Sequence, residues 1–367
     1  MGKTWPRRWS AAVVAVLCLL VGLSSNSGAA VPSAASAYFV DQNGTVTAFV
    51  DSDNGATTIP VGSQKIAPPG APITAVRTAG GLSAFTVGND GTVLKTCPTQ
   101  GTVPVTDPGA APRGAKLVAA AADGKLRLAI GGQPGFTLFM EVIDPCGTTG
   151  PKPPPAKIIV PWAPPGGDFA MATLTDGRTM LAAIDVDGAL HVLWVSPTGA
   201  LSDAVLSATG VATPGEPIAV TPKSDATPDT LLLFYTGLDG RVYEVRPAAP
   251  GTPVPHPAAG DAPAGARLAA ATGPAGNFVA YVSKSGAVTV LPSDPTGGWQ
   301  PGFQATATGI APAGAGIAGT AAFDDDFYCG NGPRPVKIKV GPHGPGPGAV
   351  WPAGPPNMVG PTTEFAA

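Results

Sequence analysis

Seven glycine-centred turns recur along this sequence, separated by about 48 residues on average. The clearest lies in MLAAIDVDGALHVLWV, residues 180 to 195, where two apolar segments flank Asp187 and Gly188. Asp-Gly tolerates the positive φ angles of a two-residue hairpin turn, and bulky or β-branched flanks favour strands. The recurrence therefore predicts a repeated β-hairpin. The seven turn glycines are Gly44, Gly91, Gly135, Gly188, Gly240, Gly286 and Gly332.

A short Ala-rich segment precedes every hairpin except the first, and its spacing agrees with that of the turns. These segments begin at Ile73, Leu117, Phe169, Ile218, Leu268 and Ile317. A further short segment follows the hairpins, for example TVPV from Thr102. Each repeat therefore contains four short strands.

Radial repetition of four-stranded sheets at this period is typical of a β-propeller, whereas helical arrays show a period of 3.6 residues. The expected fold class is all-β: a seven-bladed β-propeller with four-stranded blades. The Ala-rich segment is the expected innermost strand, because small side chains suit the crowded wall of the central channel.

Residues 1 to 30 have the pattern of a secretory signal peptide. Lys3, Arg7 and Arg8 precede an uncharged apolar run at 11 to 23, and small residues follow. That run is shorter than the roughly 20 residues that a helix needs to cross a bilayer. We therefore expect a secreted protein with no membrane span, in which residues 31 to 367 form one propeller domain.

The first repeat lacks an innermost strand in the mature chain. Counting one repeat back from Ile73 reaches the leader, and counting one forward from Ile317 reaches Phe365. We expect a strand within residues 358 to 366 to close the ring, since an open sheet edge would face the channel. The Pro- and Gly-rich residues 341 to 356 are interpreted as an irregular linker.

Charge and composition narrow the partner classes. The chain carries 24 acidic residues against 21 Lys and Arg, and removal of the leader takes away only basic ones. This balance argues against nucleic acid as a partner. No sequence pattern calls for a cofactor, so we expect none, and we expect a monomer.

Three cysteines remain beyond the leader: Cys97, Cys146 and Cys329. Export to an oxidising compartment favours one disulfide among them. Cys97 and Cys146 lie near the outer ends of equivalent strands in consecutive repeats. We predict a disulfide between these two, with Cys329 as the odd thiol.

The repeat length, the D-G-x-h-x-h turns and the segment GGWQPGFQATATG at residues 297 to 309 resemble secreted bacterial propellers related to fucose-binding lectins. In that family, sugar pockets between blades use repeated aromatic and polar residues. The resemblance implies a lectin-like, carbohydrate-binding propeller. The tryptophans beyond the leader occupy non-equivalent repeat positions: Trp162, Trp194, Trp299 and Trp351.

The residues just before each innermost strand should ring one mouth of the channel. Four of them are charged: Lys116, Asp168, Glu216 and Arg267. Converging charges around a concavity form a candidate site for a small ligand or glycan. The alternative is that they are ordinary solvated strand ends.

Two functions follow from this rim. The first is a non-enzymatic binding protein that presents the propeller face to a glycan, a cell-wall component or an extracellular protein. The second is a carbohydrate-active hydrolase or lyase with Asp168 and Glu216 as paired carboxylates, which would have to lie about 5 to 10 Å apart.

The remaining acidic and histidine patterns favour structural roles. Asp41 and Asp185 open segments similar to calcium loops, but Val50 and Trp194 replace the glutamate that an EF-hand requires, so turn chemistry explains them. The acidic run at 324 to 326 either faces water, which we favour, or binds a hard cation. His191 lies among apolar neighbours, as a core residue would.

Overall fold

The computed structural model describes most of the chain between residues 35 and 366. The described ranges are 35–52, 55–78, 81–97, 101–122, 125–131, 136–142, 156–158, 160–222, 230–247, 254–255, 261–273, 276–293, 298–320, 325–331, 334–340, 349–352 and 365–366. Several sequence-based expectations fall outside these ranges, namely the leader, the turn glycines Gly135 and Gly332, Cys146 and Asp324.

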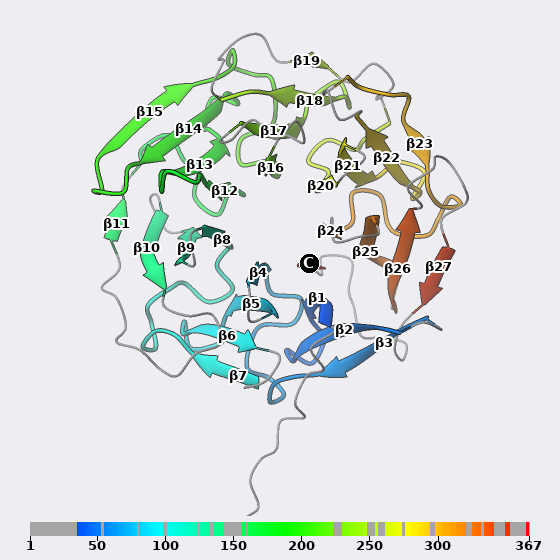
Figure 1. The fold of residues 1–367 in the computed structure, drawn as a ribbon, viewed down its shortest axis with the longest axis horizontal. Helices are drawn as coiled ribbons and strands as arrows, with labels where there is room; N and C mark the ends of the chain where they lie inside the picture. The colour runs from blue at the N-terminus through cyan, green and yellow to red at the C-terminus, as the bar shows by residue number, and fades with distance from the viewer. Residues whose placement is uncertain are drawn as a thin grey trace, which may run out of the picture.

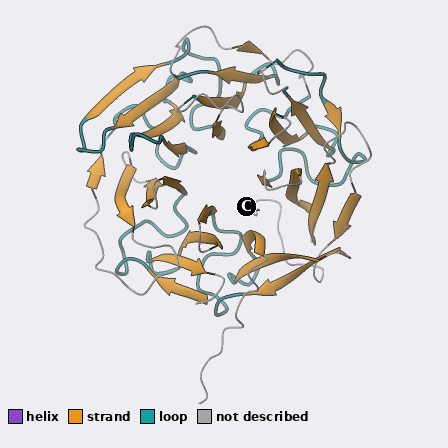
Figure 2. Cartoon of the chain, viewed as in Figure 1, coloured by secondary structure: helices purple, strands orange, loops and turns teal. Residues whose placement is uncertain are grey.

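Within the described residues, every regular element is a strand (Figure 2). The strands form seven four-stranded antiparallel sheets arranged in a ring (Figure 1). The expectation of an all-β propeller is confirmed. Three sheets, in hydrogen-bonded order, are β28 (Phe365–Ala366), β1 (Ala35–Val40), β2 (Val46–Ser52) and β3 (Gly55–Pro60); β4 (Ile73–Thr78), β5 (Gly81–Val87), β6 (Val93–Cys97) and β7 (Gly101–Pro104); and β8 (Leu117–Ala122), β9 (Lys125–Gly131), β10 (Phe136–Val142) and β11 (Ala156–Ile158).

The other four sheets follow the same order. They are β12 (Ala170–Thr173), β13 (Thr179–Ile184), β14 (Leu190–Val195) and β15 (Leu201–Val205); β16 (Ile218–Pro222), β17 (Leu231–Thr236), β18 (Val242–Val245) and β19 (Val254–Pro255); β20 (Leu268–Gly273), β21 (Gly276–Val282), β22 (Val288–Pro292) and β23 (Phe303–Gln304); and β24 (Ile317–Thr320), β25 (Asp325–Asn331), β26 (Arg334–Val340) and β27 (Ala349–Pro352).

The Ala-rich segments are the strands nearest the centre of the ring (Figure 1). Five of them begin at the residue that the repeat predicts, including β8 at Leu117 and β20 at Leu268. The sixth, β12, begins at Ala170, one residue after the predicted Phe169.

Side-chain capping sets the hairpin turns. Asp185 Oδ1 accepts hydrogen bonds from the backbone N–H groups of Asp187 and Ala189, both at 2.8 Å. Gly188 has a φ of 74°, which an L side chain rarely adopts. Asp41 makes the equivalent bonds in the first hairpin. The turn interpretation of both segments is confirmed, and the described residues contain no cluster of three metal-ligating side chains.

The core is divided among the interfaces between neighbouring sheets. In β13, Ala182 packs with residues of β17, whereas its neighbour Leu181 packs with Ala129 of β9. Successive strand residues face opposite sides, so an apolar strand of this kind needs a cover on both. In the ring, the two neighbouring sheets cover the two faces of each sheet.

The C-terminal segment completes the first sheet. Phe365 pairs with Phe39 and Ala366 pairs with Tyr38, in antiparallel orientation. This makes β28 a neighbour of β1 in the place that the Ala-rich strand has in the other sheets. It lies within the 358 to 366 range where the repeat arithmetic expects a closing strand.

The predicted linker at 341 to 356 needs correction. Residues Ala349–Pro352 form β27, the outermost strand of its sheet, paired with β26 from Val336 to Lys339. Proline is tolerated there because an edge strand has backbone groups that need no ladder partner. The Pro and Gly content of this stretch therefore did not exclude a strand.

Cys97 lies at the end of β6 and is buried, with its Sγ 3.8 Å from Ser83 Oγ. Because Cys146 is outside the described residues, the Cys97–Cys146 disulfide stays a prediction. Cys329 belongs to β25. No described helix could cross a membrane.

Candidate functional site

The same four-residue turn recurs within this chain directly before six of the innermost strands. In each turn the backbone N–H of the fourth residue donates to the carbonyl of the first, at 3.0 to 3.1 Å, and the third residue is a glycine with φ between 65° and 72°. A positive φ at the third position is what a type II turn requires. The turns are 68–71, 112–115, 164–167, 213–216, 263–266 and 312–315.

In five of the six repeats, the residue that directly follows the turn, counted here as the fifth, lines a pocket at the mouth of the channel. In the repeats before β8, β12 and β20 it is Lys116, Asp168 and Arg267, and all three line one pocket. In the repeat before β16 the fifth residue is Pro217, which also lines the pocket.

Glu216 is therefore one residue out of register with the other three charged residues. It is the fourth residue of its turn, and the equivalent positions hold Ala71, Ala115, Gly167, Ala266 and Ala315. The expectation of four charges on the rim is wrong for Glu216, which is not among the pocket-lining residues. Alignment on the turn glycine, Gly215, was the sequence signal that would have shown this.

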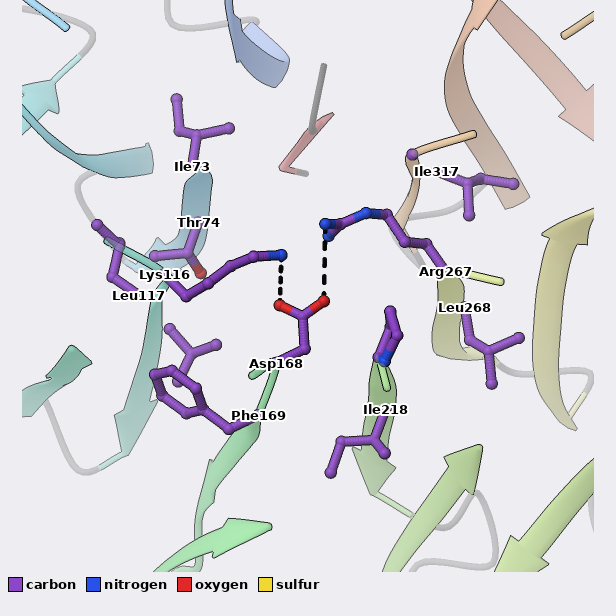
Figure 3. A pocket seen from close by; sticks show the side chains of 13 residues that line it. Ile73, Thr74, Lys116, Leu117, Asp168, Phe169, Ile218, Arg267, Leu268 and Ile317 are labelled. Carbon is purple, nitrogen blue, oxygen red and sulfur yellow. Dashed lines mark ion pairs between the residues drawn. The ribbon is translucent and has the colours of Figure 1, made fainter. Parts of the chain in front are cut away.

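The pocket has a volume of about 130 Å³ and lies where the innermost strands begin. Its centre is occupied by the charged side chains, and the first residues of six innermost segments also line it. The side chains of these six apolar residues are buried and point away from the ion pairs (Figure 3). The apolar residues are Ile73, Leu117, Phe169, Ile218, Leu268 and Ile317. The sequence analysis treated these as strand starts and did not assign them to the site.

Asp168 is held between two cations. Its Oδ1 lies 2.5 Å from Lys116 Nζ, and its Oδ2 lies 3.6 Å from Arg267 Nη2. Figure 3 shows the two basic side chains approaching the carboxylate from opposite sides. The side chains are 20% exposed for Lys116, 16% for Asp168 and 29% for Arg267, so water screens them only in part.

Backbone contacts fix the positions of the lining residues. The N–H of Asp168 donates to the carbonyl of Gly215 in the next turn, at 3.0 Å. Thr74 Oγ1 accepts a hydrogen bond from the N–H of Ala119, at 3.2 Å, which ties β4 to β8. The pocket is thus formed by an already connected ring of turns and strand ends, a preorganised arrangement.

Glu216 is buried, with 5% of its surface exposed. Neither of its carboxylate oxygens has a hydrogen-bond partner among the residues that the structure describes. Its Oε1 lies 3.7 Å from the position that a Cβ atom would take on Gly265. Asp168 faces the pocket in two ion pairs, whereas Glu216 does not face it. The two carboxylates are not presented to one ligand as the two-carboxylate mechanism requires.

His191 in β14 is held inside the protein. Its Nε2 lies 2.8 Å from Asp185 Oδ2, and 12% of its side chain is exposed. Its ring contacts that of Trp162 in a tilted arrangement, with centroids 4.8 Å apart. These contacts agree with a core role. Of the acidic run, Asp325 and Asp326 belong to strand β25.

The fold is that of a β-propeller with a small, charged pocket at one mouth of the channel. No protein-family model matches the chain, and no curated protein matches it. Among solved structures, it is similar to the BP39L lectin from Burkholderia pseudomallei, with a TM-score of 0.71, 22% identity, and coverage of 86% of this chain and 94% of that one.

Two fungal structures are also similar. The first is AofleA from Arthrobotrys oligospora, with a TM-score of 0.54, 13% identity, and coverage of 77% of this chain and 86% of that one. The second is the Aleuria aurantia lectin, described as a six-bladed propeller with a fucose recognition mode, with a TM-score of 0.53, 13% identity, and coverage of 80% and 96%. These likenesses support the fold.

Proposed function

We propose that this protein is a secreted, non-enzymatic lectin whose seven sheets are the seven blades of one propeller and whose channel-mouth pocket binds a glycan. The observation that carries the proposal is the Lys116–Asp168–Arg267 cluster in the channel-mouth pocket. Two of the similar solved structures support it, since both are named as lectins and one of them is described with a fucose recognition mode.

The pocket offers polar contacts that the hydroxyl groups of a sugar can use. Lys116 and Arg267 are hydrogen-bond donors and the Asp168 carboxylate is an acceptor, so together they match hydroxyl groups. Charged partners make these hydrogen bonds stronger than neutral ones.

The hydrolase or lyase alternative gains no support from the site. Because Glu216 is buried outside the pocket, the cluster has one carboxylate where the alternative needs two. Secretion, the removal of residues 1 to 30, the Cys97–Cys146 disulfide and a monomeric state belong to the same proposal and rest on the sequence.

The test begins with a glycan array probed with residues 31 to 367, followed by calorimetric titration of the strongest glycan. We expect Lys116→Ala, Asp168→Ala and Arg267→Ala each to weaken binding by about tenfold or more, a loss of ~1.4 kcal/mol. Arg246→Ala is the matched control, since Arg246 is a half-exposed ion-paired arginine outside the pocket, and it should bind like the wild type.

Two results would reject this function. The first is an array with no glycan bound by a folded sample. The second is a glycan whose affinity is unchanged in all three pocket variants, which would move the binding site elsewhere on the propeller.

A further inference from the structure

Strand β15 is the most exposed outer strand among those whose side chains the structure describes. All five residues, Leu201–Val205, are exposed, and the strand is the last in its sheet order, with β14 as its neighbour. It lies on the outer circumference of the ring (Figure 1). An exposed sheet edge is a template for pairing with another strand.

The outer strands of other blades carry features that block such pairing. Four end in proline, which removes a backbone donor: Pro60 in β3, Pro104 in β7, Pro255 in β19 and Pro352 in β27. Two others, β11 and β23, have only three and two residues. Strand β15 has five residues and no proline, so among the described outer strands it is the one best able to accept a partner.

The backbone pattern shows which groups of β15 face outward. The N–H of Leu206 donates to the carbonyl of Leu190 at 2.7 Å, and the pairing of His191 with Val205 continues this register. Residues of an antiparallel edge alternate between bonding inward and pointing outward. The backbone groups of Leu201, Asp203 and Val205 therefore point away from the sheet.

The same three residues share one side of the strand, because side chains alternate. Leu201 is 52% exposed and Val205 is 54% exposed, and Asp203 lies between them. On this side the pattern is apolar, acidic, apolar. Its complement is a strand whose alternate residues are apolar, basic and apolar.

We propose that β15 is a docking edge for an extended segment of a partner protein that places a Lys or Arg opposite Asp203 and apolar side chains opposite Leu201 and Val205. The charge of the strand favours a different protein over a second copy of this chain as the partner. Strand β15 contains no basic residue, and two copies paired about Asp203 would bring like charges face to face. Main-chain hydrogen bonds supply the affinity and the alternate side chains the specificity.

The probe is a labelled, end-blocked peptide of sequence Thr-Val-Thr-Lys-Thr-Val-Thr, with a Glu version as its pair, and binding is measured by fluorescence anisotropy. The wild type should bind the Lys peptide about tenfold tighter than the Glu peptide, and Asp203→Lys should reverse this preference. Asp203→Asn, which keeps the outward backbone groups, should bind the two peptides equally.

Val205→Pro tests the backbone contribution separately. It removes an outward N–H and leaves the bonds to β14 in place, so the melting temperature should not change. The affinity for the Lys peptide should fall about tenfold or more. The proposal is overturned if the Lys peptide does not bind at about 1 mM, or if Val205→Pro binds it as tightly as the wild type does. It is also overturned if the wild type binds the Lys and Glu peptides equally tightly. A wild-type dimer that Val205→Pro dissociates would assign the edge to a second copy and also overturn it.

Discussion

Arg267 Nη2 lies 3.6 Å from Asp168 Oδ2, although the two residues precede the innermost strands of sheets that are two places apart in the ring. Lys116, from the sheet on the other side of Asp168, contacts the same carboxylate at 2.5 Å. The cluster therefore links three sheets across the mouth of the channel. Ordinary inter-blade packing joins only neighbours, so this cluster adds a connection that the repeat itself does not supply.

Replacement of Asp168 should lower the free energy of unfolding, because the variant loses the connection between the three sheets. Asp168→Ala leaves Lys116 and Arg267 facing each other without the carboxylate between them, and we expect the free energy of unfolding to fall by about 1 to 3 kcal/mol in urea denaturation. Arg241→Ala is the control, because it removes an ion pair with Asp239 in which the two side chains are 54% and 45% exposed, and this pair should contribute less than about 1 kcal/mol. Equal effects of the two variants would mean that the cluster adds no stability.

Glu216→Ala should stabilise the protein. The variant removes a buried carboxylate that has no hydrogen-bond partner among the described residues, and it introduces the alanine found in four equivalent turns. We therefore expect the free energy of unfolding to rise by about 1 kcal/mol. Glu244→Ala should act in the opposite direction, since the equally buried Glu244 carboxylate is 2.8 Å from Arg246 Nε. A clear loss of stability in Glu216→Ala would show that this carboxylate has a favourable partner in solution.

Asp185 should be the most sensitive hairpin residue. Its carboxylate accepts two backbone hydrogen bonds and pairs with His191, and it is 3% exposed, so Asp185→Ala should lower the free energy of unfolding by about 3 kcal/mol. Asp187→Ala, at the exposed position of the same turn, should change it by less than about 0.5 kcal/mol. Thermal and urea unfolding of the two purified variants would check the difference, and similar values would contradict the capping role.

Tyr281 should make stability depend on alkaline pH. Burial raises the pKa of its hydroxyl above the usual value of about 10, and the hydrogen bond to Asp261, at 2.5 Å, raises it further. The folded state thus favours the neutral phenol, so its stabilising contribution is complete below about pH 10 and is lost as the pH rises through the higher folded-state pKa. Urea unfolding between about pH 8 and pH 11 should show a steeper alkaline loss for the wild type than for Tyr281→Phe; parallel curves would refute this.

The C-terminal strand should stabilise the ring more than the segment at the other end. Deletion of residues 357 to 367 removes β28 and exposes the edge of β1, and we expect the melting temperature to fall by at least about 4 °C. Deletion of 31 to 36 leaves the pairs from Ala37 to Val40 in place and should have little effect. Calorimetry on both variants would measure the two melting temperatures. A larger fall in melting temperature for the N-terminal deletion would contradict closure through β28.

Most of the strand pattern was predictable because it depends on local chemistry. The turn glycines require particular backbone angles, and the apolar flanks require cover, so spacing alone located the hairpins and the starts of β4, β8, β16, β20 and β24. The same arithmetic pointed to Phe365 as a closing residue, where β28 pairs with Phe39. The stretch at Ala349–Pro352 was misassigned because proline excludes a central strand but not an edge strand.

The sequence by itself determined which residues are equivalent in the repeat, and with them the turns, strands and charged positions of the mouth. Only the tertiary structure decided that the Lys116, Asp168 and Arg267 side chains converge on one pocket and that the Glu216 side chain is buried outside it. The physical reason is that local hydrogen bonds fix each turn separately. The distance between side chains from different turns depends instead on how the whole ring brings its sheets together.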